Sequence, residues 1–142
     1  MSSLFTKIIN GELPGRFVWS DPESVAFLTI EPIRPGHTLV VPRAEVDQWL
    51  DLPTELAQHL FTVAGVIGTA QRAEFNASRV GLLIEGYGVP HTHLHVWPSE
   101  SSADFDPANI DREPDPEQLE EASARIRRRL REHGYGELVP TD

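Results

Sequence analysis

The feature that most constrains the fold is a short alternating segment with a proline at each end. It runs Pro90-His91-Thr92-His93-Leu94-His95-Val96-Trp97-Pro98. Successive side chains of a β-strand point to opposite faces, so a strand here places the three histidines on one face and Thr92, Leu94 and Val96 on the other. The second face suits a hydrophobic core, whereas the first carries half of the protein's six histidines. The segment therefore predicts a strand with one face in the core and one face that carries the three histidines.

Signals for strands and helices alternate along the rest of the chain. Short apolar runs bounded by turn residues predict strands, and apolar residues spaced by three or four predict a long helix. Asp115, Pro116 and Gln118 predict the N-cap, first turn and capping box of a final helix. The expected elements are a helix over 3–10, strands over 16–19, 24–29 and 37–41, a helix over 52–75, strands over 80–85 and 91–97, and a helix over 115–131. We therefore predict an α+β fold: a mainly antiparallel sheet of about five strands with helices packed against it.

Composition narrows the class of protein. The 142 residues, of which 39% are hydrophobic, suffice for one core. The absence of cysteine excludes disulfides and thiolate chemistry, and no apolar run approaches the ~20 residues that span a bilayer. The first residues lack a basic stretch followed by an apolar one, so we expect a cytoplasmic protein with no membrane partner. A net charge of −10 opposes binding to a nucleic-acid polymer.

Acidic side chains concentrate toward the C-terminus. Residues 100–142 hold 12 acidic and 6 basic side chains, against 10 and 6 in residues 1–99. We expect a domain over 1–99, and an acidic segment and helix over 100–142 packed on the same domain. The final helix carries arginines in its last turns, where they complement the helix dipole, so we interpret them as a solvated helix end.

Spacing alone leaves three interpretations of the histidine row open. Neutral imidazoles bind zinc, although a site of this kind normally takes one ligand from elsewhere in the chain. Imidazole is also a good nucleophile toward phosphorus near neutral pH, and mutual repulsion discourages neighbouring rings from being protonated together. The third interpretation is a polar strand face without chemistry. Regular spacing beside an apolar alternate face favours the first two.

Several anchors besides the row make the chain resemble the histidine triad (HIT) superfamily, and within it the Hint-like branch. The family signature alternates three histidines with hydrophobic residues, and HTHLHVW at 91–97 departs from it softly at Thr92. Three further segments resemble the branch in the same order: Phe5-x-Lys7-Ile8-Ile9-x-Gly11-Glu12-x-Pro14, Ala26-Phe27-Leu28-x-Ile30-x-Pro32 and Gly36-His37-Thr38-Leu39-Val40-Val41-Pro42. The resemblance covers residues 4–98 and implies a small α+β fold that is commonly a homodimer.

The resemblance implies cleavage at the α-phosphate of a nucleotide, without a cofactor or a catalytic metal. His93 would attack phosphorus to form a nucleotidyl-histidine, and water would release the nucleoside monophosphate. His91 would orient the triad, His95 would contact phosphate oxygens or assist the leaving group, and His37 would support the row. Substrates of this kind are nucleoside phosphoramidates, aminoacyl-nucleotides and dinucleoside polyphosphates, with a purine base expected. The apolar base pocket falls on Leu4, Phe5, Ile8, Leu13, Phe27 and Ile30.

The chain departs from the family pattern at three places. The acidic ribose contact falls on Thr29. The loop before the triad lacks the usual polar side chains, so backbone N–H groups of Gly86, Gly88 and Val89 would have to replace them. The ligands that many relatives use for structural zinc fall on Ser3, Thr6 and Glu45, so we expect no zinc there. The changes at Thr29 and in the loop keep open the alternative of a nucleotide sensor with little catalysis. The spacing of the row keeps open a three-histidine metal site. We expect the isolated His59 and His133 to be surface residues.

Overall fold

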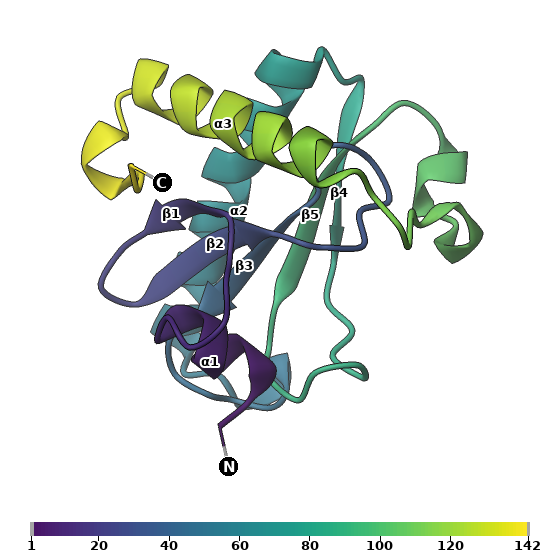
Figure 1. The fold of residues 1–142 in the computed structure, drawn as a ribbon. Helices are drawn as coiled ribbons and strands as arrows, with labels where there is room; N and C mark the ends of the chain where they lie inside the picture. The colour runs from purple at the N-terminus through teal and green to yellow at the C-terminus, as the bar shows by residue number, and fades with distance from the viewer. Residues whose placement is uncertain (1, 142) are drawn as a thin grey trace.

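Five antiparallel strands form the central sheet, in the order β1-β2-β3-β5-β4 (Figure 1). The computed structural model describes residues 2–141. The strands are β1 (Phe17–Ser20), β2 (Ser24–Leu28), β3 (Thr38–Pro42), β4 (Arg79–Leu83) and β5 (Leu94–Ser99). The helices are α1 (Leu4–Ile9), α2 (Thr54–Phe75) and α3 (Pro116–Glu132). This arrangement confirms the predicted α+β fold.

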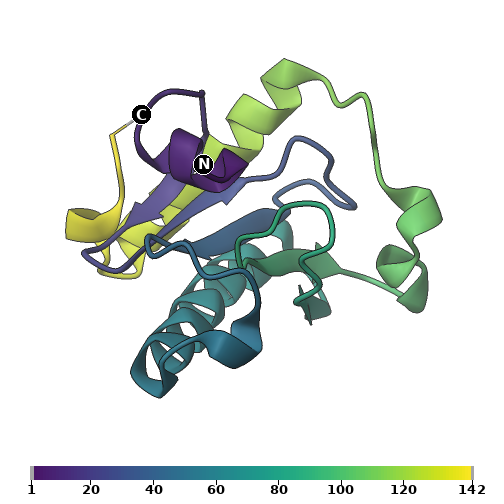
Figure 2. The same ribbon diagram turned by 90° about the horizontal axis from the view of Figure 1, so that it is seen from below.

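The two faces of the sheet bury different sets of side chains. Figure 2 shows α1 and α2 on opposite sides of the sheet. Because side chains alternate along a strand, β3 contributes Val40 to the main core with α2 and α3, and Leu39 and Val41 to a smaller cluster beneath α1. The helix over 116–132 therefore packs on the same core as the sheet, while the domain boundary at residue 99 stays a prediction.

The long helix α2 follows the predicted apolar repeat. Its buried positions include Leu60, Val63, Ile67 and Ala70, which share one helical face. The helix ends at Asn76, which has φ 51° in the left-handed region where asparagine is tolerated. No helix within residues 2–141 is both long and apolar enough to cross a membrane.

The strand that carries the histidine row begins later than predicted. β5 starts at Leu94, so His91 and His93 precede the ladder and only His95 lies within it. The backbone N–H and the Oγ1 of Thr92 both donate to the Val46 carbonyl oxygen, at 2.7 and 2.9 Å. This loop contact uses the Thr92 N–H and ends strand pairing before residue 94. It also explains how the family's hydrophobic position accommodates a buried threonine.

The start of α3 differs from the prediction in one detail. Asp115 is the N-cap as expected, and its carboxylate accepts a hydrogen bond from the Glu117 backbone N–H at 2.9 Å. The backbone N–H of Gln118 instead donates to the Asp115 carbonyl oxygen. The predicted capping box is therefore replaced by a simple N-cap, because the carboxylate points to the second rather than the third helical residue.

The arginines of α3 are only partly solvated, which corrects the expectation of a free helix end. The Nε atoms of Arg125 and Arg129 lie 2.8 and 3.2 Å from the carboxylate of Glu74, near the end of α2. Arg127 is buried and donates to the Phe17 carbonyl oxygen at 3.1 Å. These contacts tie α3 to α2 and β1, so the cluster serves the fold.

His59 is also not the isolated surface residue that we expected, whereas His133 is exposed at the end of α3. His59 Nε2 lies 2.8 Å from the Oδ2 of Asp21, a buried residue in the turn between β1 and β2. The contact joins that turn to α2. Its two partners lie far apart in sequence, so no local pattern predicts it.

Candidate active site

The structure brings all four predicted histidines together on the sheet face beneath α1. His37 immediately precedes β3, and His95 lies on the neighbouring strand β5. The ring centroid of His95 is 4.9 Å from that of His93 and 5.2 Å from that of His37. Phe5 of α1 meets the His93 ring edge-on at 4.7 Å and the His91 ring at 5.8 Å. The site is therefore enclosed by aromatic contacts on the α1 side.

Hydrogen bonds determine where His37 and His95 carry their protons. The backbone N–H of Ile33 donates to His37 Nδ1 at 3.1 Å, so the neutral ring has its proton on Nε2. His37 Nε2 then donates to His95 Nδ1 at 3.0 Å. His95 must in turn carry its proton on Nε2. His95 thus offers a hydrogen-bond donor to a ligand.

His93 carries its proton on the other ring nitrogen, Nδ1, in contrast to His95. Its Nδ1 lies 2.7 Å from the His91 carbonyl oxygen, which can only accept, so Nδ1 carries the proton. The lone pair of the neutral ring is then on Nε2. An imidazole nitrogen in this state is a nucleophile or a metal ligand. The site therefore combines a lone pair on His93 with an N–H donor on the adjacent His95.

His91 is fully buried and uses both ring nitrogens within the protein. Its Nε2 donates to the Pro42 carbonyl oxygen at 2.8 Å, and its Nδ1 lies 2.6 Å from Ser3 Oγ. It therefore has no lone pair to share with His93 and His95 at one ion. Residues 2–141 hold no group of three or more histidine and acidic side chains arranged for a metal. The geometry favours the nucleophilic interpretation over the three-histidine metal site.

Burial keeps these rings neutral. Loss of hydration lowers the pKa of His37 to about 3, and repulsion from His95 and His93 acts in the same direction. Burial, followed by repulsion from His93, lowers the pKa of His95 to about 4. Burial also lowers the pKa of His93, although the hydrogen bond to the His91 carbonyl opposes the shift. His93 therefore keeps its lone pair at neutral pH.

The predicted base pocket is only partly assembled around a common core. Three of its residues lie in or against the buried cluster beneath α1: Phe5, Ile8 and Phe27. Val89, one of the predicted backbone donors of the loop, packs against the same cluster. Three others lie outside that cluster and have exposed side chains: Leu4, Leu13 and Ile30. The first group forms an apolar floor next to the histidines, and the second group is free to contact a ligand at the rim.

The remaining predicted residues lie on two loops. Gly86 and Gly88 belong to the loop between β4 and His91, and Gly86 has φ +90°, a conformation that favours glycine. Thr29 follows β2 and is half-buried, and its Oγ1 accepts a hydrogen bond from the Glu31 backbone N–H at 3.2 Å. A neutral hydroxyl therefore stands where the resemblance implies an acidic ribose contact.

Two contributions to the site were not foreseen. The Ile33 N–H is a backbone donor, which leaves no signal in a sequence. Trp97 shares the site face of β5, and its ring lies 5.4 Å from His37 and 5.0 Å from Phe105. Gly81 pairs with Trp97 across β4 and β5 and makes room for the indole. Alternation along β5 could have indicated Trp97, whereas Phe105 comes from the acidic segment.

Comparison with known proteins gives a consistent result. A model of the HIT domain matches residues 10–102. Protein hit of Bacillus subtilis is 33% identical over 135 residues, which cover 89% of this chain and 93% of that protein. The asymmetrical bis(5'-nucleosyl)-tetraphosphatase of Schizosaccharomyces pombe is 39% identical over 88 residues, covering 58% of this chain and 47% of that enzyme.

The fold is also similar to solved structures. The crystal structure of a zinc-bound histidine triad family protein from Mycobacterium smegmatis superposes with a TM-score of 0.80 at 27% sequence identity. The superposition covers 96% of this chain and 98% of that protein. The likeness therefore includes the C-terminal helix as well as the sheet.

Proposed function

The chain belongs to the HIT family, and on that premise we propose that it is a nucleotide-binding enzyme that cleaves at the α-phosphate through His93. The observation that carries the proposal is the opposed proton placement of two adjacent rings. His93 presents a lone pair on Nε2, and His95 presents an N–H on Nε2. A nucleophile beside a donor for phosphate oxygens is the arrangement that substitution at phosphorus requires.

The proposed reaction has two steps. His93 Nε2 attacks the α-phosphorus, a P–N(His) bond forms, and the bond to the leaving group breaks. The leaving group departs with a proton from solvent when it is an amine. Water then attacks the same phosphorus and loses a proton to solvent, the P–N(His) bond breaks with its electron pair returning to His93 Nε2, and the nucleoside monophosphate is released. His95 Nε2–H donates to a phosphate oxygen, while the His91 carbonyl stabilises the proton, and the partial charge, on His93 Nδ1.

The surroundings favour a nucleotide as the occupant of the site. The apolar floor formed by Phe5 and Phe27 lies next to His93 and suits the face of a purine base. Backbone N–H groups of the loop over 86–89 supply donors for phosphate oxygens. We propose a nucleoside phosphoramidate, an aminoacyl-nucleotide or a dinucleoside polyphosphate as substrate. The enzyme name of the S. pombe relative supports the last of these.

The decisive experiment follows AMP release from adenosine 5'-phosphoramidate, in parallel with a dinucleoside tetraphosphate. We expect turnover that resists a chelator and that His93→Ala abolishes, with circular dichroism showing an intact fold. A covalent nucleotide trapped on His93 by acid quench and located by mass spectrometry would identify the intermediate.

Two outcomes would contradict this function. Full activity in His93→Ala would refute the nucleophile. Tight nucleotide binding in calorimetry without turnover of either substrate would instead indicate the sensor. That alternative is motivated by the neutral Thr29 at the ribose position.

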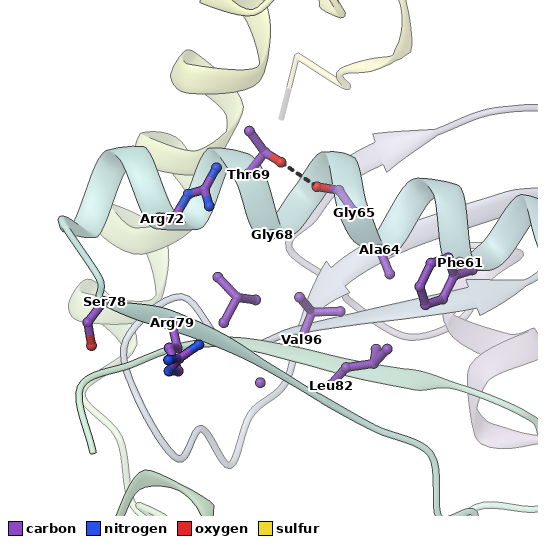
Figure 3. A pocket seen from close by; sticks show the side chains of 12 residues that line it. Phe61, Ala64, Gly65, Gly68, Thr69, Arg72, Ser78, Arg79, Leu82 and Val96 are labelled. Carbon is purple, nitrogen blue, oxygen red and sulfur yellow. Dashed lines mark hydrogen bonds between the residues drawn. The ribbon is translucent and has the colours of Figure 1, made fainter. Parts of the chain in front are cut away.

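We also propose that the protein is a homodimer formed at β4. This strand lies at the edge of the sheet, so one row of its backbone N–H and C=O groups has no strand partner within residues 2–141. A groove of about 400 Å³ runs between α2 and β4, and Figure 3 shows Phe61 and Leu82 in its lining. Both side chains are exposed, at 66% and 43%. A second copy would pair with β4 and cover this apolar surface.

Light scattering after gel filtration tests the dimer. We expect twice the chain mass of 15.9 kDa for the wild type and a monomer for Leu82→Glu, because the new charge would be buried at the contact. Leu50→Glu is the matched control, since Leu50 is also exposed (68%) but does not line the groove. A wild type that stays monomeric at high concentration would refute the dimer.

A further inference from the structure

Ser3, the N-cap of α1, contacts the triad directly. Its Oγ lies 2.6 Å from His91 Nδ1 and accepts a hydrogen bond from the Thr6 backbone N–H at 3.0 Å. Ser3 is buried, and His91 is fully buried. A residue near the N-terminus thus touches the histidine whose carbonyl oxygen holds His93.

The direction of each hydrogen bond follows from counting protons. The Pro42 carbonyl oxygen can only accept, so His91 Nε2 carries a proton, and in the singly protonated ring Nδ1 carries the lone pair. The one hydroxyl proton of Ser3 then goes to His91 Nδ1, at 2.6 Å, in preference to Thr6 Oγ1, at 3.2 Å. Because His93 Nδ1 donates to the His91 carbonyl oxygen, the orientation of His91 also sets that of His93. Ser3 therefore lies at the start of a chain that ends at the lone pair of His93.

A carboxylate holds Ser3 in place. Glu45 Oε1 accepts hydrogen bonds from the Ser3 backbone N–H at 2.6 Å and from Thr6 Oγ1 at 2.7 Å. Glu45 belongs to the segment after β3, whose Val46 carbonyl oxygen also holds Thr92. The junction of Ser3, Thr6, Glu45 and His91 thus joins α1, this segment and the triad.

A zinc ion does not fit this junction. Structural zinc sites use thiolate and imidazole ligands, whereas the junction offers two neutral hydroxyls, one carboxylate and one imidazole. The Ser3 backbone N–H and the Thr6 hydroxyl already donate to Glu45, and the Ser3 hydroxyl already lies at hydrogen-bond distance from His91 Nδ1. Hydrogen bonds alone therefore connect these four residues.

We propose that Ser3 is a positioning residue, which holds the His91 ring against the Pro42 carbonyl and thereby steadies the His91 backbone carbonyl that orients His93. The kinetic consequence rests on the function proposed above, but the hydrogen bond from Ser3 to His91 does not. Ser3→Ala removes both the N-cap and the bond to His91. Ser3→Gly removes the same side-chain hydrogen bonds but keeps most of the capping preference, and Ser3→Thr retains both the cap and the bond to His91.

Imidazole ¹⁵N NMR of the full chain tests the tautomer. We expect the wild type to show His91 with an unprotonated Nδ1 and a protonated Nε2. Ser3→Gly should move the His91 Nδ1 resonance, and Ser3→Thr should restore it. Thr6→Val is the matched control, because it weakens the tie to Glu45 and leaves the bond to His91. A protonated Nδ1 in the wild type, or a His91 signal unchanged in Ser3→Gly, would overturn the proposal.

Kinetics form the second arm of the test. Loss of one neutral hydrogen bond corresponds to a decrease in kcat of about two- to tenfold. We expect that decrease in Ser3→Gly with KM unchanged, recovery in Ser3→Thr, and wild-type kcat in Thr6→Val. Equal decreases in Ser3→Gly and Thr6→Val would show a structural role only and overturn the proposal. Absence of turnover in the wild type would count against the proposed function, and the NMR result would still decide the role of Ser3.

Discussion

Replacing Asp21 with asparagine removes the charge at a buried hub while keeping its shape. Asp21 Oδ2 accepts hydrogen bonds from Trp19 Nε1 at 2.7 Å, and from Ser24 Oγ and His59 Nε2 at 2.8 Å each. Its Oδ1 accepts the backbone N–H groups of Glu23 and Ser24 at 2.8 Å each. These five bonds join β1, β2 and α2 at one carboxylate.

The geometry sets the size of the effect. If the new amide nitrogen takes the place of Oδ1, the backbone N–H groups of Glu23 and Ser24 lose their acceptor. If it takes the place of Oδ2, the side-chain donors of Trp19, Ser24 and His59 lose theirs. Each unsatisfied buried donor costs about 1–3 kcal/mol. His59 is half-buried and can turn to water, so the smaller count applies. We expect Asp21→Asn to lower the free energy of unfolding by about 2–6 kcal/mol at pH 7.

The same carboxylate predicts a pH signature. Burial alone would raise the pKa of Asp21, but hydrogen bonds from Trp19, the Glu23 backbone, Ser24 and His59 outweigh it and lower the pKa from 3.8 to about 2. A lowered carboxyl pKa contributes stability above the unfolded value of 3.8, and this stability is lost as pH falls through about 2. The difference between wild type and Asp21→Asn should therefore shrink below pH 4.

Urea titrations monitored by tryptophan fluorescence at pH 7 and pH 3 measure both effects. Glu23→Gln is the control, because Glu23 is the exposed neighbour and its side chain takes no part in the hub. A loss below ~0.5 kcal/mol for Asp21→Asn at pH 7, the size of an ordinary surface substitution, would refute the hub.

Two further predictions concern the packing behind the site and its protonation. Gly81→Ala would place a Cβ 2.5 Å from the Trp97 indole, so urea titration should show a loss of about 1–3 kcal/mol. Gly65→Ala meets no atom within 4 Å and should instead gain up to ~1 kcal/mol from helix propensity; equal midpoints for the two variants would contradict the steric argument. Burial lowers the pKa values of His37 and His95 from 6.5 to about 3 and about 4, so the unfolded chain takes up protons first. Stability should therefore fall as pH decreases from 6.5 to about 4, and an unfolding midpoint that stays flat over this range would show that the rings are not buried as neutral groups.

The sequence predicts the parts of this protein that depend on local periodicity. The apolar repeat of α2 and the N-cap of α3 follow from side chains that are neighbours along the chain. The fold class is predicted from the same local patterns. The family is predicted from motifs whose residues occur at fixed spacing. The convergence of His37 and His95 was expected only through the resemblance, because those residues are 58 positions apart.

The remaining features depend on contacts that no local pattern encodes. Strand β5 starts at Leu94 because Thr92 bonds to a loop more than 40 residues away. The hydrogen bond between His59 and Asp21 joins residues that are 38 positions apart in the sequence. Ser3 caps α1 through a local bond to Thr6, but its second bond, to His91, appears only in three dimensions. In each case tertiary contacts decided between alternatives that were locally equivalent.

Main-chain atoms orient three of the four site histidines. The Ile33 N–H, the Pro42 carbonyl and the His91 carbonyl fix the rings of His37, His91 and His93. Point substitutions at Ile33 or Pro42 leave a carbonyl in place, and most leave the N–H as well. The vulnerable property is instead the path of the chain. Insertion or deletion of a single residue between 33 and 37, or between 42 and 46, would shift these groups out of register, so length in these loops is under tighter constraint than residue identity.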